Sequence, residues 1–192
     1  MVTSLYAPLL LLVVELECSI MSKQLIIFRH AKSSWNSPAL DDFSRPLNDR
    51  GVESAKLMGA TLQKMDYLPD CIHLSSSVRT EETCQLFLQA AELNDISCHS
   101  SRSLYHAGLT TLLSTINSFD NAFSCVMLIG HNPGLEALLL HFCPNAPMSN
   151  GKLLTTANVA VIELPTDDWA SLGKKASLLR LLRPKEISQE NL

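Results

Sequence analysis

Three short polar clusters in the sequence hold residue types that bind tetrahedral anions. The first is Arg29-His30, the second is Ser75–Arg79 (SSSVR), and the third is Gly130-His131-Asn132. Each arginine can donate paired, charge-assisted hydrogen bonds to a phosphate group. Helices that begin near Val78 and Pro133 would add backbone N–H donors for the same anion. Two arginines and two histidines together match a dianionic tetrahedral group such as a phosphoryl group.

Each polar cluster directly follows a short apolar run of the kind that forms a strand buried on both faces. The runs are Gln24–Phe28, Cys71–Leu74 and Ser124–Ile129. Because the carboxyl ends of parallel strands share one edge of an open α/β sheet, ligands bind at that edge. We therefore expect the three clusters to converge, although they lie about 50 residues apart along the chain.

Strand-like runs alternate with helical periodicity along the chain from residue 21 onward. This alternation predicts a three-layer α/β/α sandwich with a largely parallel mixed sheet. Helices are predicted over about 48–65, 78–93, 110–119 and 135–142, and further strands over 158–164 and 177–182. At the start of the last of these helices, Asn132 is the expected cap and Pro133 occupies the expected first helical position.

Composition limits the classes of function. The chain has 192 residues, of which 46% are hydrophobic and 18% charged, which fits one globular domain. A net charge of −4 argues against a general nucleic-acid binder, which would show a basic excess. Six cysteines without a CxxC pair indicate reduced, mostly buried thiols rather than a zinc or disulfide framework, and hence a cytoplasmic protein.

The domain is predicted to occupy residues 21–185, with residues 186–192 as a C-terminal tail. Residues 1–20 are predicted to be an extension, and Met21 is an alternative start because it opens the first clear strand. The apolar run Leu5–Val14 is too short to span a bilayer and lacks the basic flank of a secretory signal. We expect a monomer without stable membrane association; a weak anchor in residues 1–20 is the alternative.

Four motifs in order resemble the histidine phosphatase superfamily, in particular its small SixA-type phosphohistidine phosphatase branch. They are RHAKSSW from Arg29, DDFSRPLNDRG (Asp41–Gly51), SSSVRT (Ser75–Thr80) and GHNPGLE (Gly130–Glu136). The first motif alone is a weak signal, whereas four motifs in order, three of them at strand ends, are specific. The resemblance covers about residues 23–184 and implies a phosphoglycerate-mutase-like fold.

The resemblance implies a role for each matching residue. His30 would attack phosphorus, while Arg29, Arg79 and His131 would hold the phosphoryl oxygens; water would then hydrolyse the phosphohistidine. This agrees with the ability of a neutral imidazole to act as a nucleophile near pH 7 and of covalent catalysis to divide one difficult step into two. Positioning and charge stabilisation by the arginines would need no metal or other cofactor. The candidates for further substrate contacts are Arg45, Ser75 and Asn132.

The sequence departs from the larger members of the superfamily at their general acid, a glutamate in the loop after the second arginine motif. The corresponding region here, Leu104–Gly108 (LYHAG), has no carboxylate, and His106 is the alternative proton donor. Because imidazole has a pKa of about 6.5, it leaves a phosphorus atom without the help that an alcohol needs. The expected substrate is therefore a protein phosphohistidine. A phosphomonoesterase acting on small molecules, or a non-catalytic phosphate-binding module, are the alternatives.

Other polar residues have simpler interpretations. His73 and His141 are expected to pack within a strand and a helix, and His99 is expected to be solvated in a serine-rich loop. The aspartates Asp41 and Asp42 belong either to a solvated loop or to the rim of a pocket.

Overall fold

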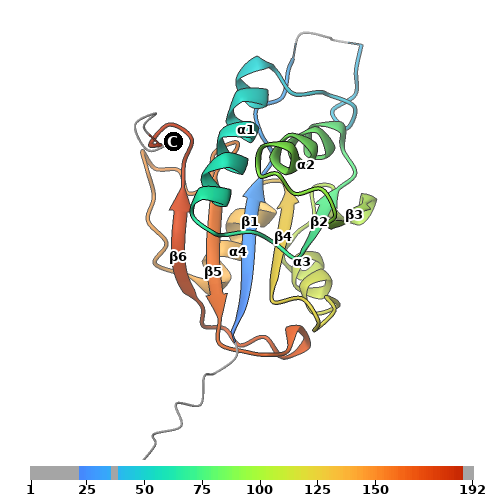
Figure 1. Cartoon of the computed structure of the whole chain (residues 1–192). Helices are drawn as coiled ribbons and strands as arrows, with labels where there is room; N and C mark the ends of the chain where they lie inside the picture. Colours follow the sequence, from blue (N-terminus) through green and yellow to red (C-terminus); the bar gives the residue numbers. More distant parts are fainter. Residues whose placement is uncertain (1–21, 36–38, 188–192) are drawn as a thin grey trace, which may run out of the picture.

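The computed structural model describes residues 22–35 and 39–187 (Figure 1). The predicted extension over residues 1–20 lies outside the described residues, as does most of the predicted tail. The elements follow one another as β1 (Lys23–Arg29), α1 (Asp49–Lys64), β2 (Cys71–Ser75), α2 (Val78–Ala90), β3 (Ser97–Ser101), the 3₁₀ helix η1 (Arg102–Leu104), α3 (Leu109–Ile116), β4 (Cys125–Gly130), α4 (Gly134–Phe142), β5 (Val159–Leu164), the 3₁₀ helix η2 (Trp169–Ser171) and β6 (Ser177–Leu182).

The described strands form a six-stranded sheet in the order β3-β2-β4-β1-β5-β6. The pairs β1–β4, β2–β4 and β2–β3 are parallel, whereas β5 pairs with β1 and with β6 in antiparallel fashion. The prediction of a largely parallel mixed sheet is confirmed. Strands β1 and β4 are the central pair because their apolar side chains are buried on both faces of the sheet.

Two helices cover each face of the sheet (Figure 1). On one face, Ala55 and Met58 of α1 and Phe87 of α2 pack with Phe28 of β1. On the other face, Leu112 of α3 and the apolar side of α4 pack with alternate residues of β1 and β4. The three-layer arrangement therefore follows from alternation along the strands, which sends successive side chains to opposite cores.

One strand was not predicted from the sequence. Residues Ser97–Ser101 (SCHSS) form the edge strand β3, so the expectation that His99 lies in a loop is wrong. An edge strand pairs on one side only, and β3 is polar and mostly exposed, so it carries no apolar alternation. Strand β3 is held in place by its ladder of backbone hydrogen bonds with β2.

Two further expectations concern thiols and membrane helices. The five cysteines within the described residues are free thiols, and of these only Cys98 is exposed. None of the described helices combines the length and the hydropathy needed to cross a bilayer.

Candidate active site

The three polar clusters meet at the carboxyl ends of β1, β2 and β4, which lie side by side (Figure 1). The rings of His30 and His131 are 5.0 Å apart between centroids. Arg79 is the second residue of α2, and its guanidinium donates a hydrogen bond to His131, which belongs to the third cluster. The convergence predicted from parallel strand ends is therefore seen in the structure.

His30 is held in one orientation and one tautomer. Its backbone N–H donates to the Gly130 carbonyl at 3.1 Å, which ties β1 to β4 at the site. Its ring nitrogen Nδ1 lies 2.8 Å from the Ala31 carbonyl; a carbonyl only accepts, so Nδ1 carries the proton. In the neutral ring, Nε2 therefore keeps its lone pair.

The environment of His30 favours this neutral ring. The residue is only 8% exposed. Burial lowers its pKa to about 3; the hydrogen bond to Ala31 acts in the opposite direction, and the charges of Arg79 and Arg29 lower the pKa further. A ring that is unprotonated at neutral pH is ready to act as a nucleophile.

His131 is fixed as the opposite tautomer. Its Nδ1 accepts from Arg79 Nη2 at 3.4 Å, because a guanidinium can only donate. Its Nε2 therefore donates to Ser75 Oγ at 2.9 Å. Burial, followed by the proximity of His30 and Arg79, lowers the pKa of His131 to about 2. Ser75 thus belongs to the site as the residue that orients His131.

Arg79 is almost completely buried, at 2% exposed, and its guanidinium is shared between two partners. It donates to His131, to the Asp42 backbone carbonyl and, from Nη2 at 2.9 Å, to Asp42 Oδ2. The start of α2 is anchored to the first cluster by Thr83, which accepts from the Ala31 N–H and donates to the Arg79 carbonyl. Arg79 is therefore positioned before any anion binds.

Arg29 and Asn132 share one backbone acceptor. Arg29 Nη1 and Asn132 Nδ2 both donate to the Leu154 carbonyl, at 2.6 and 2.9 Å. Arg29 Nε and Asn132 Oδ1 are buried without a partner, so each has hydrogen-bonding capacity left for a ligand. The expectation that Asn132 caps the following helix is wrong: Pro133 is the N-cap of α4, because the Asn132 side chain turns to Leu154 instead.

Arg45 lies on the rim, beneath an exposed tryptophan. Its guanidinium carbon is 3.3 Å from the centroid of the Trp35 ring, and Trp35 is 73% exposed. Arg45 also donates to the Ser34 carbonyl at 3.0 Å, to Ser33 Oγ, and to Asp42 Oδ1 at 2.7 Å. The predicted position of Arg45 at the rim is consistent with this geometry.

Asp42 lies at the rim of the site rather than in a fully solvated loop, the other interpretation that the sequence left open. Its carboxylate accepts from Arg45, from Arg79 and from the Tyr105 hydroxyl, the last at 2.6 Å. Burial would raise the pKa of Asp42, but the hydrogen bond from Tyr105 and the charge of Arg79 hold it well below its usual range. Asp42 is therefore an ionised acceptor at neutral pH.

The loop after η1 brings two aromatic side chains to the same rim. His106 Nε2 lies 3.3 Å from Asp42 Oδ2, and the His106 ring is 4.9 Å from that of His131. The Tyr105 ring meets the His131 ring edge to face at 5.4 Å. The region Ser103–Gly108 contains no carboxylate of its own, but Asp42 supplies one from the loop after β1.

One glycine sets the distance between this loop and the turn that carries His131. A side chain at Gly134, the first residue of α4, would place its Cβ 1.9 Å from the Ala107 carbonyl oxygen. Only glycine permits so close an approach. Gly134 thus brings the loop with Tyr105 and His106 against the start of α4.

Fold and site together define an α/β phosphatase whose candidate nucleophile is a histidine. The family model described as "Histidine phosphatase superfamily (branch 1)" matches residues 25–104. The solved structure of a protein assigned as the phosphohistidine phosphatase SixA from Agrobacterium tumefaciens superposes with a TM-score of 0.73 at 29% identity, covering 84% of this chain and 98% of that one. The chain is therefore similar to the histidine phosphatase superfamily in sequence over residues 25–104, and to the SixA structure in fold.

Two relatives show the range of that similarity. An uncharacterised chloroplast protein of Arabidopsis thaliana is 29% identical over 160 residues, which are 77% of this chain and 69% of that protein. A 2,3-bisphosphoglycerate-dependent phosphoglycerate mutase of Methylobacterium radiotolerans is 33% identical over 86 residues, 44% of this chain and 41% of the mutase.

Proposed function

We propose that the protein hydrolyses phosphohistidine on other proteins through a covalent intermediate on His30. The observation that carries this proposal is the fixed tautomer of His30, whose Nδ1 proton is bound by the Ala31 carbonyl. The Nε2 lone pair is thereby left as the reacting atom, in a ring that is neutral at physiological pH.

The reaction would proceed in two displacements. In the first, the lone pair of His30 Nε2 forms a bond to phosphorus while the bond from phosphorus to the leaving group breaks, and the leaving group takes that electron pair. In the second, a water oxygen attacks phosphorus, the P–Nε2 bond breaks, and inorganic phosphate leaves. His30 then has its lone pair back for the next turnover.

The arginines would stabilise the charge on the transferring group. Arg79 is held between Asp42 and His131, and Arg29 is held by the Leu154 carbonyl, so both guanidinium groups are placed before substrate arrives. Preorganised donors of this kind supply much of the stabilisation in phosphoryl transfer. In the arrangement observed, His131 contributes by orienting Arg79 rather than by adding a charge of its own.

The rim supports a preference for an N–P bond. The described carboxylate at the rim, Asp42, is ionised and accepts hydrogen bonds from Tyr105, Arg45 and Arg79, so it has no proton to donate. An alkoxide leaving group requires such a proton, and general-acid help is worth about 10²–10⁴-fold. A phosphohistidine ring that is protonated at its other nitrogen leaves as neutral imidazole and needs no donor. The similarity to the Agrobacterium SixA structure supports the same substrate class.

A phosphomonoesterase acting on small molecules is the second candidate. The similarity to phosphoglycerate mutases over 86 residues favours it. It requires an acid for the alcohol leaving group, and His106 is the residue at the rim that could fill this role.

The deciding experiment compares kcat/KM for two peptides of one sequence that carry either phosphohistidine or phosphoserine. We expect a preference of about 10²-fold or more for phosphohistidine. p-Nitrophenyl phosphate, whose leaving group needs little protonation, should react slowly but measurably.

His106→Ala provides the control for that comparison. We expect it to leave the rate on the phosphohistidine peptide nearly unchanged. Equal rates on the two peptides, combined with a selective loss of phosphoserine hydrolysis in His106→Ala, would show that His106 is the acid and would favour the second candidate.

A further inference from the structure

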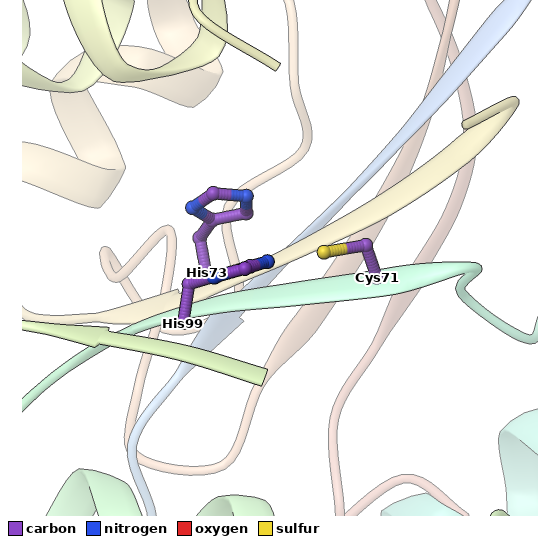
Figure 2. A group of neighbouring side chains, drawn as sticks. All are labelled: Cys71, His73 and His99. Atoms are coloured by element: carbon purple, nitrogen blue, oxygen red, sulfur yellow. The ribbon is translucent and has the colours of Figure 1, made fainter. Parts of the chain in front are cut away.

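A second cluster of reactive side chains lies away from the phosphoryl site, on β2 and the edge strand β3 (Figure 2). Cys71 and His73 are two residues apart on β2, so their side chains project from the same face. His99 of β3 is the register partner of His73, which places it beside them on that face. The rings of the two histidines are 4.8 Å apart between centroids.

The three side chains each offer one ligand atom, and these atoms all lie within 4.8 Å of one another. In a tetrahedral zinc site with Zn–S of about 2.3 Å and Zn–N of about 2.0 Å, ligand atoms are about 3.3–3.6 Å apart. The largest of these separations would therefore need to shorten by at most about 1.5 Å. Figure 2 shows the Cys71 thiol directed along the sheet toward the two rings.

The surroundings suit a site with three protein ligands and one open position. Cys71 is buried on the side of the sheet that α3 covers, and its sulfur is a free thiol. His73 is half-buried and packs on Phe119, with ring centroids 4.4 Å apart. His99 is exposed at the sheet edge, so solvent can deliver an ion and supply a fourth ligand.

We propose that Cys71, His73 and His99 bind one divalent ion of the zinc class. One sulfur and two imidazole nitrogens match the ligands that zinc prefers, and oxygen-seeking ions such as Mg²⁺ and Ca²⁺ would find no oxygen ligand among the three. The cluster is separate from the phosphoryl site: its three side chains lie along β2 and β3, whereas the phosphoryl site lies at the ends of β1, β2 and β4. A bound ion would link the polar edge strand β3 to the buried strand β2.

The test measures Zn²⁺ binding to the full chain by calorimetry and repeats the titration with Co²⁺, whose absorption spectrum reports sulfur ligation. We expect one ion per chain and a sulfur-to-cobalt charge-transfer band. His99→Ala is the informative variant because its exposed side chain on the edge strand can be removed without opening a core. Loss of a second-shell partner alone costs about 10–100-fold in metal affinity, so loss of this direct ligand should cost about 100-fold or more.

Two control variants separate this site from other ligands in the chain. Cys98→Ala removes the neighbouring thiol, which lies on the opposite face of β3, and should leave binding and the cobalt band unchanged. His30→Ala tests whether the histidines of the phosphoryl site bind the ion instead, and it should also leave the affinity and the cobalt band unchanged. Unchanged affinity in His99→Ala, a cobalt spectrum without the sulfur band, or binding abolished by His30→Ala would overturn the proposal.

Discussion

The floor and the rim of the phosphoryl site are built in different ways. The floor consists of His30, Arg79 and His131, which are at most 8% exposed and are fixed at the ends of strands or the start of a helix. The rim consists of Asp42, Arg45, Tyr105 and His106 together with Trp35, and most of these come from the loops after β1 and β3. In the proposed mechanism the floor supplies the fixed donors and the nucleophile, and the rim faces the leaving group. The difference predicts a large loss of activity on every substrate from floor variants, and smaller effects, some of them selective between substrates, from rim variants.

Removing the nucleophile should give the largest effect. We expect His30→Ala to lower kcat by about 10⁴-fold or more on phosphohistidine and on activated esters alike, because the proposed covalent intermediate forms on this ring. Acid-labile label from substrate should be trapped on His30 in the wild type and be absent from the variant. A folded variant, judged by circular dichroism, that kept substantial activity would show that His30 is not the nucleophile.

The buried histidines of the floor should also affect how the free energy of unfolding depends on pH. The pKa values of His30 and His131 are lowered by burial to about 3 and about 2, against about 6.5 in an unfolded chain. Between these values the unfolded state binds more protons, so the contribution of both rings to stability is complete above pH 6.5 and is lost as the pH falls.

Urea unfolding at several pH values measures this contribution. Each ring that is neutral when folded and protonated when unfolded adds up to about 1.4 kcal/mol per pH unit to the slope of stability against pH. His131→Asn should therefore give a shallower slope between pH 6 and 4 than the wild type. Parallel slopes for the two proteins would mean that His131 is protonated in the folded state.

A rim variant should give a smaller effect on oxyanion binding. Asp42→Asn keeps the size and one acceptor oxygen but removes a negative charge beside Arg79 and Arg45. Near a protein surface, the interaction between two unit charges a few ångströms apart contributes about 1 kcal/mol after screening by solvent. We therefore expect tungstate or inorganic phosphate to inhibit the variant about fivefold more tightly. Weaker inhibition would show instead that the carboxylate is needed to order Arg79.

The sequence predicted the candidate site well where its residues directly follow strands that are buried on both faces. The runs that became β1, β2 and β4 are apolar on both faces, and the residues that follow them converge because parallel strands end at one edge. Arg29, His30, Arg79 and His131 could be placed together from that pattern. The fold could likewise be assigned from the order of strands and helices.

The missed features depend on contacts between distant segments. Asp42 reaches Tyr105 across 63 residues of sequence, and no local pattern distinguishes it from a solvated loop residue. The side chain of Asn132 could satisfy either a helix end or the Leu154 carbonyl, and the sequence favoured the helix end. The pairing of His99 with His73 could not be found without β3, which has the composition of a loop.

The contact between Gly134 and the Ala107 carbonyl constrains how this site could be altered in evolution or by design. A longer lid that carries its own acid would have to enter the chain between Ser103 and Gly108, directly beside that contact. An insertion there that displaced Ala107 would remove the support of α4 on one side and change the turn that aims His131. The loop that carries Tyr105 and His106 and the turn that carries His131 must therefore change together. If the proposed mechanism holds, a broader substrate range would require paired substitutions rather than a single inserted segment.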